Sequence, residues 1–146
     1  MSELPRLWRC PRCARTFANR NQSHTCRPLG DLDAHFVGKD PAVREIFDRI
    51  VGIVGGLGPV DVLAEKTRIA LHARMSFAAF TPRIHWLDGH VVLAEMLDSE
   101  RFTEVEVYSP RNMLHAFRLR DPAEVDAEVI DWFTRAYAVG QQQHLR

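Results

Sequence analysis

The sequence lacks the features of a membrane or secreted protein. Its longest apolar run, residues 50–60, is interrupted by four glycines and is shorter than the roughly 18 residues that a membrane span needs. The first ten residues, MSELPRLWRC, contain no apolar stretch of signal-peptide length. With 146 residues, 46% hydrophobic and 26% charged, the chain is also too apolar for a disordered protein and has the size of a single domain. These absences favour a soluble, cytoplasmic protein.

Lysine is scarce, with two residues against 17 arginines, and the formal net charge is zero. The zero hides an asymmetry, because residues 1–30 contain six arginines and one glutamate, a net charge of +5, whereas residues 31–146 carry −5. A basic N-terminal segment joined to an acidic remainder predicts two units with different surfaces. Since arginine exceeds lysine along the whole chain, the arginines of the first segment do not by themselves identify a nucleic-acid partner.

Cysteine is also scarce, and all three cysteines lie within the first 26 residues. Three cysteines cannot all pair within one chain, and such a cluster in a reducing compartment is typical of metal binding. Thiolate sulfur and imidazole nitrogen suit zinc, and four such ligands close a structural site. The spacing Cys-x2-Cys-x10-His-x-Cys predicts that four residues bind one zinc ion: Cys10, Cys13, His24 and Cys26. Trp8 and Phe17 are expected to cover this site, because so short a module has little else for a core.

The first half of this segment resembles a zinc finger of the two-cysteine, two-histidine kind, because residues 13–17 keep the spacing from the second cysteine to a core aromatic. The second half departs from that family, since His24 and Cys26 are too close to lie on successive turns of a helix. The departure argues against a recognition helix that enters a DNA groove. We expect residues 1–28 to form a small zinc-binding module, called the head below, and residues 29–39 to form a linker.

Residues 40–146, called the body below, have the pattern of a domain with two main helices. Asp40-Pro41 is typical of a helix start, and apolar residues then recur at helical spacing until the glycines at 55 and 56. The capping-box sequence of residues 121–124 predicts the start of a second helix, whose apolar stripe continues to Gly140.

Between the two helices, six apolar or alternating stretches have the length of strands: residues 60–63, 67–73, 76–80, 90–96, 105–108 and 113–119. The connections are too short for crossover helices, so most strand pairs should be antiparallel. Pro82 and the Asp88-Gly89 pair predict breaks or turns, and residues 83–87 fit a strand and a loop equally. We expect an α+β domain with a mostly antiparallel sheet of about five strands and both helices on one face.

Four strings occur in the chain in a fixed order: CPRCARTFANRNQSHTC, EKTRIALHARMSFAAFTPR, SPRNMLHAFRL and WFTRAYAVG. Together they resemble an uncharacterised bacterial family, domain of unknown function 5655, over nearly the whole chain. The resemblance implies the same four zinc ligands and one compact body domain. It supplies no catalytic residues.

Polar side chains recur on two of the expected strands. Arg68 and His72 share one side of the stretch 67–73, while Arg111 directly precedes the stretch that contains His115. If the two strands lie near one another, six residues gather around an anion: Lys66, Arg68, His72, Arg74, Arg111 and His115. The alternative is a solvated sheet face with scattered charges, and the aromatic and apolar neighbours of His115 favour a hydrogen-bonded structural histidine there.

No pair of nucleophile and base is recognisable, because the chain contains neither G-x-S-x-G nor H-E-x-x-H and zinc would take all three cysteines. The leading hypothesis is therefore a zinc-binding protein that binds nucleic acid or an anionic small molecule. A second hypothesis is a structural or protein-interaction role, in which zinc only stabilises the head. A third is a small enzyme that uses a polar face of the sheet.

Overall fold

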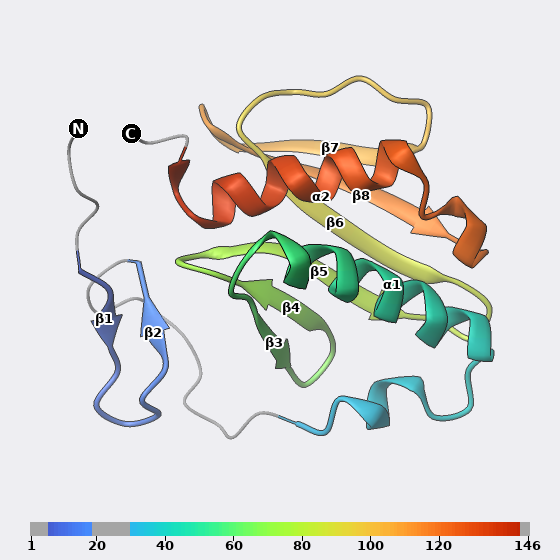
Figure 1. Cartoon of the computed structure of the whole chain (residues 1–146), viewed down its shortest axis with the longest axis horizontal. Helices are drawn as coiled ribbons and strands as arrows, with labels where there is room; N and C mark the ends of the chain where they lie inside the picture. Colours follow the sequence, from blue (N-terminus) through green and yellow to red (C-terminus); the bar gives the residue numbers. More distant parts are fainter. Residues whose placement is uncertain (1–5, 19–29, 144–146) are drawn as a thin grey trace.

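A computed structural model describes residues 6–18 and 30–143 of the chain. The body consists of two long helices and a six-stranded sheet, and the head contributes a two-stranded hairpin beside it (Figure 1). In chain order the elements are β1 (Trp8–Arg9), β2 (Thr16–Phe17), the 3-10 turn η1 (Asp33–Phe36), α1 (Pro41–Leu57), β3 (Asp61–Ala64), β4 (Ile69–His72), β5 (Ser76–Pro82), β6 (Leu87–Leu93), β7 (Phe102–Ser109), β8 (Asn112–Leu119), the 3-10 turn η2 (Pro122–Glu124) and α2 (Ala127–Gly140).

The large sheet has the strand order β3-β4-β5-β6-β8-β7, and every neighbouring pair is antiparallel. This arrangement confirms the α+β class, and each of the six predicted stretches overlaps one strand. The sheet has six strands rather than about five, and the hairpin of the head adds a separate two-stranded sheet. β8 pairs with β6, which places β7 at the edge of the sheet.

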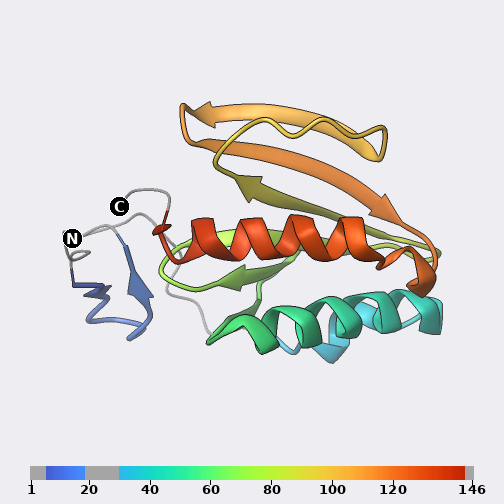
Figure 2. The same ribbon diagram turned by 45° about the horizontal axis from the view of Figure 1, so that its top comes forward.

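Both helices lie on one face of the sheet, in front of it in Figure 1, and Figure 2 shows the same layering from another angle. Their apolar stripes bury aromatic rings against the strands: Phe80 of β5 lies 5.4 Å from Phe47 of α1 and 5.9 Å from Phe133 of α2, between ring centroids. Because successive residues of a strand point to opposite faces, the same strands present a second face that no helix covers. We call this second surface the open face.

α1 continues past the point where the sequence predicts its end. Gly55 and Gly56 lie inside the helix, which ends at Leu57 and is followed by Gly58. Both glycines are exposed, whereas Val54 is fully buried, so packing of the opposite side outweighs the weak helix propensity of glycine.

The Asp88-Gly89 pair is not a turn but lies within β6, so the prediction of a break there is wrong. A Cβ atom at Gly89 would lie 2.9 Å from Phe117 Cζ and 3.0 Å from Phe80 Cδ1. Glycine is therefore needed here because a larger residue would collide with two aromatic rings of the core, and not because the chain turns. The turn is formed by residues 83–86, where Arg83 N–H donates to the carbonyl of Trp86 at 2.9 Å.

The predicted capping box forms, but it caps η2 rather than α2. Ala123 N–H donates to Asp121 Oδ1 at 2.8 Å, and Asp121 N–H donates to Glu124 Oε1 at 2.9 Å. α2 begins only at Ala127, where Asp126 is a second N-cap. Because two capping signals lie within six residues, the chain begins the 3-10 turn η2 at the first and α2 at the second. The spacing of apolar residues alone does not distinguish these two starts.

The residues that the sequence assigns to a linker are attached to the body. Leu32 and Phe36 pack against the core, and Gly30 N–H donates to the carbonyl of Ala64 at 2.7 Å. Within the ranges that the structure describes, no helix is long and apolar enough to cross a membrane.

Candidate ligand-binding site on the open face of the sheet

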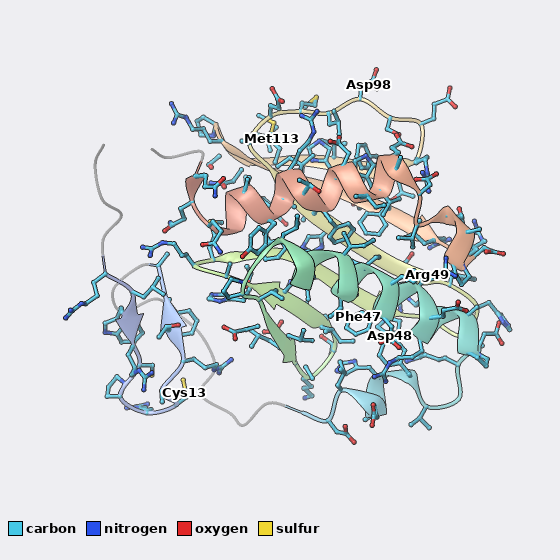
Figure 3. The ribbon with its side chains drawn as sticks, in the orientation of Figure 1. Cys13, Phe47, Asp48, Arg49, Asp98 and Met113 are labelled. Carbon is cyan, nitrogen blue, oxygen red and sulfur yellow. The ribbon has the colours of Figure 1, made fainter. Side chains whose placement is uncertain are left out.

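The hairpin of the head holds two of the four predicted zinc ligands in one tight turn. Ala14 N–H donates to the carbonyl of Cys10 at 2.8 Å, and Cys10 N–H donates to the carbonyl of Arg15 at 2.9 Å. Ala14 has a φ of 62°, a left-handed conformation that closes the turn next to Cys13. Cys13 lies at the turn end of the hairpin (Figure 3).

The other two predicted ligands, His24 and Cys26, lie outside the described residues. Within residues 6–18 and 30–143, no group of three or more His, Cys, Asp or Glu side chains lies close enough to hold a metal ion. Zinc binding by the complete set of four ligands therefore stays a prediction.

The aromatic residues of the head contact both each other and the body. The rings of Trp8 and Phe17 lie 6.0 Å apart, and the ring of Phe17 meets the edge of His72 of β4 at 6.2 Å. A hollow of about 370 Å³ between head and body is lined by Arg9, Arg15, Asp61 and His72 among others. Burial lowers the pKa of His72, and the charge of Arg15 lowers it further while Asp61 opposes both. His72 therefore belongs to the contact between head and body.

The six residues predicted to surround an anion lie in different places. Lys66 lines a separate hollow of about 380 Å³ with Lys39 and His35. Arg74 Nε donates to Gln142 Oε1 at 2.9 Å, near the end of α2. Arg111 lies in the turn between β7 and β8, and His72 faces the head.

His115 lies on the helix side of the sheet, with an exposed fraction of 0%. Leu97 N–H donates to its Nε2 at 2.9 Å, so Nδ1 carries the hydrogen and donates to the carbonyl of Met113 at 3.0 Å. Burial lowers its pKa, and its ring lies 4.8 Å from that of Phe102. These contacts agree with the alternative interpretation, a hydrogen-bonded structural histidine.

Arg68 lies at the open face and lines a hollow of about 350 Å³ there. We call it the open-face hollow, and its lining includes Arg68, Ser76, Ala79, His90, Tyr108 and Asn112. The strand register explains its shape, because one row of residues across the sheet consists of Ala70, Ala79, His90, Ala116 and Glu104. Ala79 and His90 of this row line the hollow, and the small side chain of Ala79 leaves a depression between the larger side chains around it.

The sheet curls around the open-face hollow. Arg68 directly precedes β4 and Tyr108 lies on β7, four strand spacings away, or about 19 Å across a flat sheet. Both side chains nevertheless line the same hollow, and the charge of Arg68 influences the pKa of Tyr108. Curvature of the sheet and the length of the two side chains therefore bring Arg68 and Tyr108 to the same hollow.

The charges around the open-face hollow have opposite signs on its two sides. Burial lowers the pKa of His90 to about 4; the charge of Arg68 lowers it further, whereas Glu106 on β7 opposes the shift. Burial raises the pKa of Tyr108, and Glu106 adds to this increase. At neutral pH the floor of the hollow is therefore an uncharged imidazole, with a guanidinium on one side and a carboxylate on the other.

Two polar groups at the open-face hollow have hydrogen-bonding capacity left. Arg68 Nε donates to Glu65 Oε1 at 2.8 Å, and this bond occupies one of the five guanidinium donors. Asn112 Nδ2 donates to Ser109 Oγ at 2.9 Å, but the buried Oδ1 of Asn112 accepts no hydrogen bond from the described residues. A buried acceptor without a donor is costly, but this oxygen has almost no exposed surface, so the capacity that a ligand can use is that of Arg68.

Of the residues that line the open-face hollow, sequence reasoning singled out Arg68 but not His90, Tyr108 or Asn112, nor did it single out Glu106 beside them. Glu104 and Glu106 are two positions apart, and in a strand this spacing puts both side chains on one face, which is a usable signal. His90 was hidden because the preceding Asp-Gly pair predicted a turn instead of a strand interior.

Residues 32–140 match the model of a protein family described as Domain of unknown function (DUF5655). No curated protein and no solved structure matches the chain.

Proposed function

The chain belongs to the DUF5655 family, whose description names no activity. We propose a function from the residues of this chain itself. The protein is a zinc-stabilised binding protein that holds a small molecule with an anionic group in the open-face hollow. The observation that carries this proposal is the convergence of Arg68, His90, Tyr108 and Asn112, from four different segments, on one hollow.

The side chains of the open-face hollow suit binding of an organic anion. The outer NH₂ groups of Arg68 match the two oxygens of a carboxylate or phosphate, and this planar fork gives orientation as well as charge. Ala79 and Val92 supply apolar surface beneath the ligand. His90 is a weak base at neutral pH because its pKa is lowered to about 4, and this favours binding over proton-transfer catalysis.

The geometry of the head favours a small molecule over nucleic acid. Arg9 and Arg15 line the hollow between head and body, which also contains Asp61. The carboxylate of Asp61 would repel the phosphates of a nucleic acid at this place.

Binding of 3-phenylpropanoate and of phenyl phosphate, measured by isothermal titration calorimetry, tests the ligand proposal. We expect at least one of these anions to bind, and Arg68→Ala to weaken it about tenfold or more, because a hydrogen bond to a charged group contributes about 1.5–3 kcal/mol. Arg49→Ala is the matched control: Arg49 lies on α1 (Figure 3), and its side chain is 50% exposed and bridged to Glu45, as Arg68 is 47% exposed and bridged to Glu65. Loss of binding in both variants, or in neither, contradicts the proposal.

The zinc part of the proposal is tested by metal analysis of freshly purified protein. We expect one zinc ion per chain, and loss of most of it in Cys13→Ser, because the predicted site needs three thiolates and one imidazole. Chelation should disrupt the contact of Phe17 with His72, while the body, which has its own core, should still unfold cooperatively. Protein without zinc, or full zinc content in the serine variant, rules out this metal site.

A further inference from the structure

We infer that the open-face hollow binds a zwitterion, a molecule that carries a carboxylate and an ammonium group on an apolar body, as a free amino acid does. The inference rests on the proposed function and names the ligand class of the same site.

The first observation is the separation of opposite charges across the hollow. Arg68 approaches from the β4 side, and Glu106 lies on β7 at the far edge of the sheet. Glu106 pairs with Leu114 of β8, and Leu114 pairs with Val92 of β6, which lines the hollow, so the strand register places Glu106 beside it. The charges of Arg68 and Glu106 act on His90 and on Tyr108 with opposite signs. Since His90 is uncharged at neutral pH, Arg68 is the single cationic side chain among the described residues that line this hollow.

The second observation is the set of hydrogen-bond acceptors on the side of β7 and β8. Asn112, Ser109 and Tyr108 line the hollow on this side, and the hydroxyl oxygens of Ser109 and Tyr108 can accept hydrogen bonds. An ammonium group has three N–H donors and no acceptor, so it suits a side of the hollow that offers hydroxyl oxygens and the nearby carboxylate of Glu106.

The charge balance argues against a ligand that is only an anion. Arg68 is already bridged to Glu65, and Glu106 adds a negative charge on the opposite side. A carboxylate bound to Arg68 therefore meets a repulsive carboxylate across the hollow unless the ligand brings its own positive charge. A zwitterion pairs with both sides, and its apolar part lies on Ala79, Val92 and Met75.

The test uses three probes with the same phenyl body. L-phenylalanine carries both charges, 3-phenylpropanoate carries only the carboxylate, and 2-phenylethylamine carries only the ammonium group. We expect L-phenylalanine to bind about tenfold more tightly than either partial probe, because one charge-assisted hydrogen-bond pair is lost in each of them.

Variants assign each charge of the ligand to its side of the hollow. Arg68→Ala should remove the advantage of L-phenylalanine over 2-phenylethylamine, and Glu106→Gln should remove its advantage over 3-phenylpropanoate. Glu45→Gln, which removes an exposed carboxylate on α1, should change neither ratio. If 3-phenylpropanoate binds as tightly as L-phenylalanine and Glu106→Gln has no effect, the zwitterion inference is wrong while the proposed binding of an anion stands. If no probe shows binding that depends on Arg68, both fail.

Discussion

Because the imidazole of His90 is uncharged in the folded protein, we expect the free energy of unfolding to decrease in acid. In the folded protein its pKa is lowered from 6.5 to about 4, so between these values the unfolded chain binds a proton that the folded chain excludes. The contribution of the uncharged His90 to the free energy of unfolding is therefore fully present above about pH 6.5, and it is lost as the pH falls towards 4. Each pH unit in this interval costs about 1.4 kcal/mol, which amounts to about 3 kcal/mol in total. For a chain of this size the loss corresponds to a decrease in Tm of roughly 6–12 °C.

The assay compares urea and thermal unfolding at pH 7, 6, 5 and 4 for the natural protein and for His90→Gln, which keeps a polar side chain without a titrating group. Because carboxylates and other histidines titrate in both proteins, the difference between the two curves isolates His90. His85→Gln is the control, since His85 is exposed and bonded to Asp40 at 2.7 Å. Parallel pH curves for the natural protein and His90→Gln would refute the reasoning.

Two pairs of substitutions test the packing and capping of the helices by urea denaturation. Gly140→Ala should destabilise the protein by about 1–3 kcal/mol, because the new Cβ atom would overlap the ring of Phe77. Gly52 has open space around it, so Gly52→Ala should instead stabilise α1 by about 0.5–1 kcal/mol. Equal effects of the two changes would contradict this account of the core. Asp126→Ala should cost about 1 kcal/mol or more, because it removes the N-cap of α2, whereas Asp131→Ala removes an exposed ion pair and should cost about 0.5 kcal/mol or less. A larger loss for Asp131 would show that the cap contributes little.

Local signals in the sequence located the secondary structure elements better than their ends. Asp40-Pro41 marked the start of α1 correctly, because a proline at the first helical position acts within one turn, although the Asp40 carboxylate bonds His85 instead of capping the helix. The glycines at 55 and 56 and the pair Asp88-Gly89 were misread, because their role depends on Val54 and on the rings above Gly89, which belong to the tertiary structure.

The site was harder to predict than the fold, because it depends on strand order. Pairing of β6 with β8 puts β7 at the edge, and curvature then brings Tyr108 towards Arg68. A single sequence shows which residues share a strand face but not which strands are neighbours. Arg68 was therefore identified as a ligand-binding candidate, whereas its partners His115 and Arg111 were chosen by an assumed proximity that the strand register does not provide.

The row of alanines at the open face has a consequence for how such a protein diversifies. On β5, Ala79 faces the hollow while its neighbour Phe80 faces the helices, and on β8 Ala116 alternates in the same way with Phe117. Mutations can therefore alter the depth of the hollow at one set of positions while the adjacent set keeps the chain folded. Descendants of one ancestral gene can in this way acquire different ligands without first passing through an unstable intermediate, and exchange of Ala79, which lines the hollow, for a larger residue is the shortest route by which an engineer can change what is bound.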